Sequence, residues 1–315
     1  MKNKLKIALI LLTTSYLLLA APARGQEFNT GINPAVLQME AETPSLIKVP
    51  ITLQNLSDQT ITYGIFLRPF KASTDKSGEP NYDPALMNEY KSFFSNVQVN
   101  DENNIVTEIT LPPRQNKDLT LRINLQKDEK PGDRYFTVVF LSQGKEAENQ
   151  GSAAGARGGI GTNVLLTVGT KSQPEGRIAN FSVPRFVTRG PVDFTIDLAN
   201  HSDFYVTTNG NLVIKNMFGQ PVGNLEFGPF NILAGSNRLA SNNEDLSNPK
   251  LIWNEKFLLG IYKAEVSAAL SDRGPLFKET KTFIAFPLEL GLGIILVIIA
   301  STWLFKRARK KNQES

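Results

Sequence analysis

The sequence has 315 residues but no cysteine and only one histidine, His201. Without cysteine the chain can form no disulfide, no thiolate metal site and no cysteine nucleophile. A single histidine excludes the multi-histidine sites that usually hold zinc. His201, Ser202 and Asp203 are adjacent in the chain. Members of a catalytic triad converge from separate segments, so His201 is interpreted as a surface turn residue.

Other motifs of catalysis and cofactor binding are also missing. No G-x-S-x-G nucleophile elbow is present. Residues 158–161 (GGIG) lack the lysine of a phosphate loop and are interpreted as a flexible hairpin tip. Residues 242–245 (NNED) lack the residue order of a calcium loop. The sequence therefore predicts a protein that is not an enzyme and has no cofactor and no metal site. A catalytic function would require two carboxylates, or Ser202 with a distant acid, to converge in a deep pocket.

The net charge of +4 comes from the two ends of the chain. Residues 24–285 carry 26 Lys and Arg against 28 Asp and Glu, which is close to neutral. Binding of a polyanion needs lysines and arginines clustered on one face, and no such cluster occurs outside the C-terminal tail. Nucleic acid is therefore excluded as a partner.

Both ends of the chain are hydrophobic and carry adjacent positive charge. Residues 1–23 combine three lysines, an uncharged run and a small-residue A-P-A site, the pattern of a secretory signal peptide. Residues 286–305 contain a single charge, Glu289, and the basic tail 306–315 follows. Positive residues concentrate on the cytoplasmic side of a membrane span. We expect a single-pass protein of the cell membrane with an extracytoplasmic ectodomain and a cytoplasmic C-terminus.

The ectodomain has the patterning of β-strands along most of its length. Apolar and polar residues alternate with the period of a half-buried strand, and some runs are dense in β-branched and aromatic residues. The strands are predicted at residues 47–53, 61–67, 119–125, 135–141, 164–168, 192–198, 212–214 and 262–270. Pro50 has no backbone donor, which predicts a strand edge or a bulge at that position.

One short helix and one domain boundary interrupt this pattern. Asp83-Pro84 resembles an N-cap and first helical residue, with apolar residues near helical spacing up to Phe94, although Phe93 could equally begin the next strand. Residues 171–176 (KSQPEG) have the composition of a linker. We expect two domains, 24–173 and 174–285, each an antiparallel immunoglobulin-like β-sandwich. The predicted fold class is all-β, with one C-terminal transmembrane helix.

A short internal repeat supports a duplication. Residues 51–58 (ITLQNLSD) and 196–203 (IDLANHSD) both have the pattern I-x-L-x-N-x-S-D, a strand that runs into a turn. Later in each half a glycine precedes a strand that contains a tyrosine, at Gly132 and Gly260.

This layout resembles the WxL-interacting protein family of bacterial cell surfaces, through strand and turn patterns in both halves. The first half resembles the peptidoglycan-binding domain of that family, and the second half resembles its host-binding domain. In the first half the matching segments are residues 51–58, 131–132 (PG) and 161–168 (GTNVLLTV). In the second half they are residues 198–200 (LAN), 209–214 (NGNLVI), 218–219 (FG) and 260–263 (GIYK). Ala234-Gly235 departs from the Pro-Gly turn that is usual there. The resemblance transfers no ligand contact to an individual residue.

Aromatic residues gather around the longest insertion of the first half, residues 71–96. Aromatic side chains are enriched in interfaces but are equally common in cores. The candidate partner-binding residues are Phe70, Tyr82, Tyr90 and Phe93.

Two functions are consistent with these patterns. In the first, the membrane-anchored surface protein binds an envelope protein or peptidoglycan through its first domain. The alternative is a structural scaffold or assembly partner at the membrane surface whose edge strands pair with another protein in a chaperone-like way.

Overall fold

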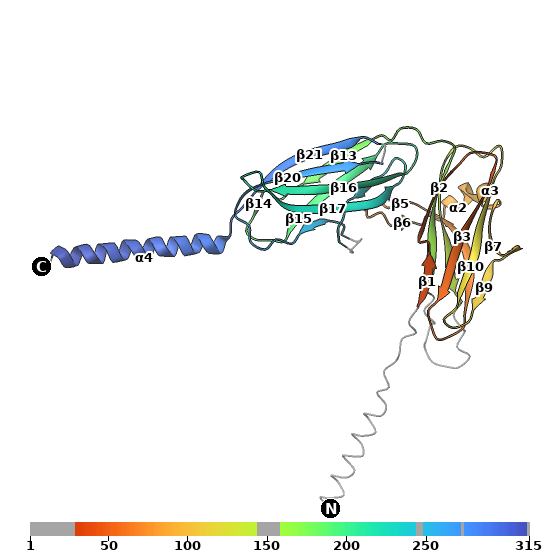
Figure 1. Ribbon diagram of the computed structural model, residues 1–315, viewed down its shortest axis with the longest axis horizontal. Helices are drawn as coiled ribbons and strands as arrows, with labels where there is room; N and C mark the ends of the chain where they lie inside the picture. Colours follow the sequence, from red (N-terminus) through yellow and green to blue (C-terminus); the bar gives the residue numbers. More distant parts are fainter. Residues whose placement is uncertain (1–28, 144–157, 244–247, 272–273, 314–315) are drawn as a thin grey trace, which may run out of the picture.

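The computed structural model describes residues 29–143, 158–243, 248–271 and 274–313 (Figure 1). The predicted signal peptide, residues 1–23, lies outside the described residues, as do Glu244 and Asp245 of the acidic segment.

The first domain is a sandwich of two five-stranded sheets. One sheet has the order β1 (Thr30–Asn33), β3 (Ser45–Asn55), β10 (Asn116–Leu125), β7 (Val97–Asp101) and β8 (Asn104–Ile105). The other has the order β2 (Val36–Ala41), β12 (Gly159–Val168), β11 (Gly132–Ser142), β4 (Ile61–Pro69) and β9 (Glu108–Leu111). A two-stranded ribbon follows β4 and consists of β5 (Lys71–Ala72) and β6 (Pro80–Asn81).

The second domain repeats this architecture. One sheet contains β13 (Gly176–Ser182), β15 (Val192–Asn200) and β18 (Asn237–Leu239), and β19 (Leu251–Trp253) also pairs with β15. The other has the order β14 (Phe186–Val187), β21 (Leu276–Ala285), β20 (Gly260–Ala269), β16 (Val206–Lys215) and β17 (Pro221–Ile232). The pair β14–β21 is parallel, as is β2–β12 at the same place in the first domain. The sheet that begins with β2 in the first domain and the sheet that begins with β14 in the second therefore have matching connectivity, as expected for a duplication.

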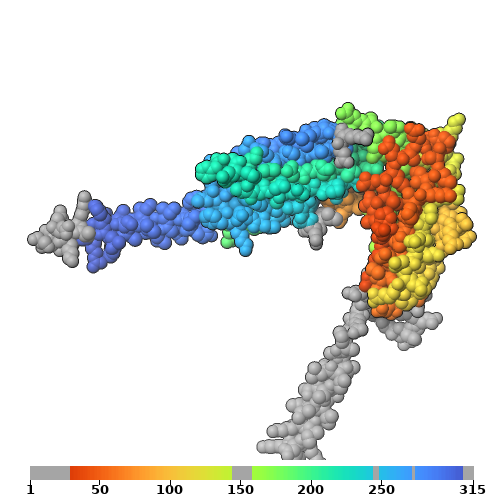
Figure 2. Space-filling model, in the orientation of Figure 1, coloured from red at the N-terminus to blue at the C-terminus, as the bar shows by residue number. Residues whose placement is uncertain are grey.

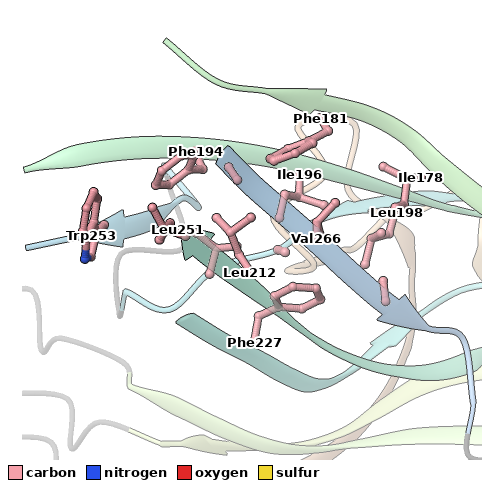
Figure 3. Close-up of a cluster of buried hydrophobic side chains, with 14 of the residues drawn as sticks. Ile178, Phe181, Phe194, Ile196, Leu198, Leu212, Phe227, Leu251, Trp253 and Val266 are labelled. Carbon is pink, nitrogen blue, oxygen red and sulfur yellow. The ribbon is translucent and has the colours of Figure 1, made fainter. Parts of the chain in front are cut away.

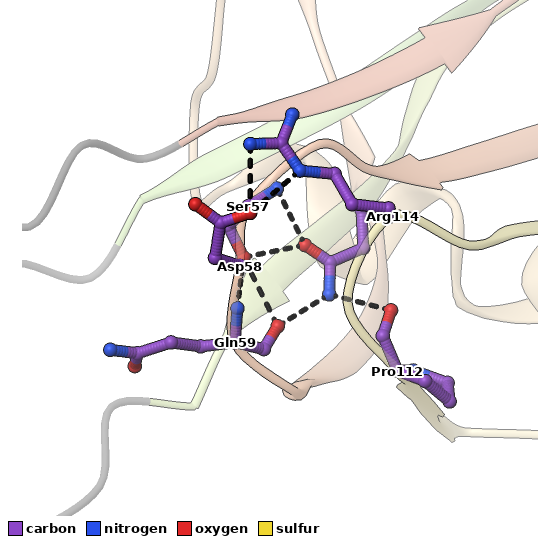
Figure 4. A network of polar contacts seen from close by, with 6 residues as sticks. Ser57, Asp58, Gln59, Pro112 and Arg114 are labelled. Carbon is purple, nitrogen blue, oxygen red and sulfur yellow. Dashed lines mark hydrogen bonds and ion pairs between the residues drawn. The ribbon is translucent and has the colours of Figure 1, made fainter.

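The repeated asparagine has the same structural role in both domains. The side-chain Nδ2 of Asn55 lies 2.7 and 3.0 Å from the carbonyl oxygens of Gln59 and Pro112 (Figure 4). It also lies 3.0 Å from the carbonyl oxygen of Leu111. The Nδ2 of Asn200 lies 2.8–3.1 Å from the carbonyl oxygens of Phe204, Ile232 and Leu233. In each case Oδ1 accepts the backbone N–H two residues later. Each side chain therefore closes its turn against a neighbouring strand segment.

All eight predicted strands are present, because apolar residues of both sheets face each other inside each sandwich. In the second domain, side chains such as Phe181, Phe194 and Leu212 fill the space between the sheets (Figure 3). In the first, Ile51, Leu121 and Phe136 do the same. The all-β prediction with two immunoglobulin-like sandwiches is confirmed.

Local predictions hold with two adjustments. The predicted helix is present as two single turns, α2 (Leu86–Glu89) and α3 (Lys91–Phe94), and Asp83 accepts the N–H of Ala85. Gly159, expected at a loop tip, begins β12. At Pro50 the edge of β3 is unpaired, because β1 pairs only with the four residues from Thr52 to Asn55. This agrees with the missing donor of proline.

The two domains meet at an angle and form an elbow, with the β5–β6 ribbon on its inner side (Figures 1 and 2). The helix α4 (Leu288–Gln313) leaves the end of the second domain that is opposite to the first (Figure 1). Within α4, residues Leu288–Arg307 are long and apolar enough to cross a membrane, and none of this stretch is buried against the domains. The helix continues to Gln313, so it includes most of the predicted basic tail.

Candidate functional site: the junction between the domains

A network centred on Asp133 joins the two domains at the start of β11. The Asp133 carboxylate accepts hydrogen bonds from the Thr167 and Tyr135 hydroxyls and from the backbone N–H of Tyr205 in the second domain. The Tyr135 hydroxyl in turn accepts the backbone N–H of Ala234 at 3.1 Å. One carboxylate and one phenol therefore connect β11 to two separate segments of the second domain.

Apolar side chains from both domains pack around this network. Phe70, Leu165 and Tyr205 are buried together, with Tyr135 and Leu233 against them. The Phe70 and Tyr135 rings stack with centroids 6.1 Å apart. The cluster is separate from the two sandwich cores, so it exists only where the domains meet.

Burial at the junction shifts two ionisable groups. It raises the pKa of Tyr205 to about 12, with a further contribution from the Asp133 charge. Burial lowers the pKa of Lys171, whose ammonium lies 3.3 Å from the centroid of the Tyr205 ring. Both shifts arise because the interface removes these groups from water.

The loop between β5 and β6 docks onto β18 of the second domain. Lys76 forms an ion pair with the buried Asp197 at 2.6 Å, and the backbone N–H of Leu239 donates to the Lys76 carbonyl. Gly78 lies directly against the guanidinium of Arg238, so that a Cβ at this position would be 2.1 Å from the Arg238 Cζ. A larger residue at position 78 would therefore have to displace the Arg238 side chain.

A pocket of about 560 Å³ lies between the domains, and we call it the junction pocket. Its volume is within the range of about 300–1,000 Å³ that is typical of ligand sites. Strands β2, β12, β17 and β18 and the β5–β6 ribbon contribute to its wall. The wall includes apolar side chains of both domains: Val36, Phe70, Leu165, Ile232 and Leu233.

Among the described residues, Arg238 is the only cationic one that lines the junction pocket. Its guanidinium lies 4.7 Å above the centroid of the Phe230 ring and donates to the Asn231 carbonyl. Among the described residues it has no carboxylate partner, and its buried Nε has no hydrogen-bond partner. Burial lowers its pKa, although an arginine remains charged in proteins. The pocket therefore combines apolar walls with one cation that forms no ion pair with any described carboxylate.

The four predicted site residues separate into two groups. Phe70 and Tyr82 both line the junction pocket, and the Tyr82 hydroxyl bonds to Thr137 at 2.9 Å. Phe93 belongs to the core of the first domain and Tyr90 packs against that core. The Tyr90 hydroxyl accepts the backbone N–H of Tyr135. Partner binding by these residues stays a prediction.

Sequence patterns mark Tyr135 only as the tyrosine of a strand that follows a glycine, and they do not single out Tyr205, Leu165 or Arg238. Each lies in a strand or strand end whose alternation explains it locally, so nothing marks it as a junction residue. The sequence feature that could have indicated the junction is the acidic residue Asp133, directly after the turn glycine Gly132.

Paired carboxylates are not found in the described lining of the junction pocket. Among the described residues Glu79 is its only acidic one, whereas a glycosidase needs two. Within the part of the chain that the structure describes, no group of three or more His, Asp or Glu side chains could hold a metal ion.

Comparison with known proteins finds similarity of fold only. No family model and no curated protein matches the chain. The class 5 fimbriae chaperone CfaA aligns with 80% of this chain and 99% of its own, at 11% identity and a TM-score of 0.38. The Escherichia coli chaperone DraB aligns with 80% and 96%, at 10% identity and a TM-score of 0.37. A Salmonella enterica structure of the SafA pilin in complex with the SafB chaperone aligns with 81% and 97%, at 10% identity and 0.37. At these values the similarities carry no argument about function.

Proposed function

We propose that this chain is a non-enzymatic, membrane-anchored assembly partner that holds a segment of another exported protein in the junction pocket. The observation that carries the proposal is the pocket itself, whose wall is built by both domains. A network of buried hydrogen bonds and an aromatic cluster hold these domains in one arrangement. A preformed site of this kind binds without the cost of ordering the domains first.

The lining favours a peptide segment with apolar side chains and an acidic group. Val36, Leu165 and Leu233 offer apolar surface, and Arg238 offers a guanidinium that pairs well with a carboxylate. A carboxylate would neutralise the Arg238 guanidinium, which forms no ion pair among the described residues, and would thereby reduce the cost of burying it.

The anchor sets where this binding takes place. The apolar part of α4 spans 20 residues, about 30 Å at 1.5 Å per residue, which equals the hydrocarbon thickness of a bilayer. With the basic residues after Phe305 on the cytoplasmic side, both sandwiches lie outside the membrane. The first domain and the junction pocket then face the cell envelope.

The partner class follows from the resemblance to the WxL-interacting family. A surface protein with a WxL domain is the candidate partner, and peptidoglycan is the candidate ligand of the first domain alone. The protein partner and the glycan would bind at different places, because a glycan bound to the first domain alone would not need the junction pocket.

A matched pair of substitutions tests this function. Val36 on β2 lines the junction pocket and Leu46 on β3 does not, and both are exposed strand residues of the first domain. The purified full chain in detergent is incubated with exported surface proteins and, separately, with purified cell wall. We expect Val36→Trp to abolish retention of the protein partner and Leu46→Trp to preserve it. Equal retention by both variants, or retention of cell wall only, would contradict the proposal.

Strand addition along β17 is a second candidate for the same role. This strand of 12 residues is the longest in the described structure and forms an outer edge of its sheet, paired with β16. An unpaired edge can template a strand from a partner. Hydrogen exchange on the partner complex distinguishes the two modes. Added protection within β17, with no effect of Val36→Trp on binding, would favour strand addition over the pocket.

A further inference from the structure

Exposed apolar side chains form a row across the end of the second domain from which α4 leaves. Phe186, Ile284 and Ile261 are each about half exposed, at 52%, 50% and 51%. Phe186 pairs with Ile284 in the parallel β14–β21 ladder, and Ile284 pairs with Ile261 in the β21–β20 ladder. Residues paired directly across strands have side chains on the same face. The three therefore lie side by side on the outer face of the sheet.

The row continues onto the turn between β16 and β17. The sulfur of Met217 lies 3.4 Å from the position of a Cβ on Gly260, the residue before Ile261. Phe218 follows in the same turn and is 80% exposed, the largest exposure among the apolar residues of both domains. Phe257 and Leu259, in the segment that leads into β20, are exposed as well. We call these seven residues the apolar rim: Phe186, Met217, Phe218, Phe257, Leu259, Ile261 and Ile284.

The apolar rim is the part of the outer face closest to the apolar helix. Only Phe286 and Pro287 separate the end of β21 from the first residue of α4. This short link is fixed, because the backbone N–H of Phe286 donates to Val187 in β14. At most about 14 Å of extended chain lies between Ile284 and Leu288.

The outer face changes character one row further from α4. There Lys215 pairs with Lys263, which pairs with Thr282. Both lysines contact Glu265, at 2.6 and 2.8 Å, and none of these residues is apolar. Proteins that lie on a membrane place apolar side chains toward the acyl boundary and ammonium groups at the headgroups. The apolar rim followed by a row of lysines has this order.

We propose that the apolar rim seats the second domain on the outer leaflet of the bilayer. The proposal rests on the membrane anchoring by α4 stated above. Because Leu288–Arg307 already matches the hydrocarbon thickness, Leu288 lies at the outer boundary of the acyl chains. The rim then lies beside the headgroups, where its aromatic and aliphatic side chains leave water. Seating fixes the tilt of the second domain and thereby the direction in which the first domain and the junction pocket point.

The absence of cysteine makes the test direct, since each label site is the only thiol of its variant. The full chain is reconstituted in liposomes of phosphatidylcholine and phosphatidylglycerol with an environment-sensitive fluorophore at Phe218→Cys. Leu276→Cys is the matched control, because Leu276 is also exposed but starts β21 at the opposite end of the same sheet. Ile298→Cys, within α4, reports membrane insertion.

Nitroxide groups on the lipid headgroups then measure proximity to the membrane surface. We expect a blue-shifted emission and a large loss of fluorescence at position 218, and little change at position 276. Quenching by acyl-chain nitroxides at position 298, with positions 218 and 276 equally unaffected, would overturn the seating while leaving the anchor intact. No quenching at position 298 would refute the anchor and the seating together. Self-quenching at position 218 that rises with the protein-to-lipid ratio, without headgroup quenching, would show a second copy on the apolar rim and would also overturn the proposal.

Discussion

At the scale of single residues, two buried asparagines carry the turns that the repeat encodes. Asn55 and Asn200 are both 0% exposed. Each shares its two N–H groups among three backbone carbonyls and accepts one backbone N–H. A buried carbonyl left without a partner costs about 1–3 kcal/mol. Each asparagine therefore contributes more to the free energy of unfolding than the small size of its side chain suggests.

We predict that Asn200→Ala lowers the free energy of unfolding of the second domain by about 2–4 kcal/mol. The measurement is urea unfolding followed by the fluorescence of Trp253, in a Trp303→Phe background so that one tryptophan reports. Asn55→Ala should act equally on the first domain, seen by calorimetry. The control for Asn55→Ala is Asp58→Asn, because Asp58 follows Asn55 in the same turn and is exposed, and its ion pair with Arg114 lies in water. A loss below about 1 kcal/mol for Asn200→Ala would contradict the role assigned to the amide.

A second residue-scale prediction concerns acid stability. Hydrogen bonds from Lys215 and Lys263 lower the pKa of Glu265 from 4.5 to about 2. As the pH falls below 4.5 the unfolded chain takes up this proton before the folded chain does, so stability present above pH 4.5 is lost toward pH 2. We expect Glu265→Gln to flatten this part of the curve of unfolding free energy against pH. An acid limb of unchanged slope in Glu265→Gln would show that the two lysines do not hold the carboxylate in solution.

At the scale of elements, alternation predicted eight of the strands, but it did not predict β2, β13, β17 and β21 or the segments between strands. The pattern around Leu119 and Leu121 predicts β10 because it records which side of a strand is buried. Aromatic residues of the insertion have no strand alternation, and the helical spacing up to Phe94 does not say which face is buried. Phe93 and Tyr90 therefore could not be told apart from Phe70 and Tyr82 until the fold placed two against the first core and two at the junction pocket.

The junction itself could not be predicted, because its contacts join residues far apart in the chain. Tyr135 contacts Ala234, and Lys76 contacts Asp197, across separations of 99 and 121 residues. No local pattern encodes such pairs, and a single sequence gives no covariation.

The β5–β6 loop gives an element-scale prediction. Gly78 has φ +87° and lies against Arg238, whereas Gly219 has φ +80° in a turn with nothing within 4 Å of a Cβ. Alanine is strained at both positions, but only Gly78→Ala must also displace Arg238. We expect Gly78→Ala to speed amide exchange of Leu239, which donates to Lys76, and Gly219→Ala to leave it unchanged. Equal exchange in the two variants would show that the loop does not hold β18.

At the scale of the whole molecule, the elbow is predicted to be stiff. The Asp133–Tyr135 network and the buried aromatic cluster give the interface two kinds of contact that a mobile linker lacks. The distance between spin labels at Ile105→Cys and Val222→Cys, measured by pulsed electron resonance, should therefore have a narrow distribution.

Tyr135→Phe removes the hydroxyl that joins Asp133 to Ala234, and we expect it to broaden that distribution. Tyr82→Phe is the matched control, since the Tyr82 hydroxyl bonds only to Thr137 of its own domain. A broad distribution in the unmodified chain, or no difference between the two variants, would show that the elbow is not held by this network.

A stiff elbow, an anchor and a seated second domain together would present the junction pocket at a fixed height and direction above the membrane. The proposed function therefore depends on the junction pocket.

The most direct test is photo-crosslinking in living cells with a benzophenone amino acid in place of Tyr82, which lines the junction pocket and is about half exposed. The same probe in place of Ile105, exposed on β8 outside the pocket, is the control. The account predicts a covalent adduct with an exported protein from position 82, no adduct from position 105, and loss of the adduct when Val36→Trp fills the pocket. An adduct at position 82 that persists with Val36→Trp, or equal adducts from both positions, would contradict it.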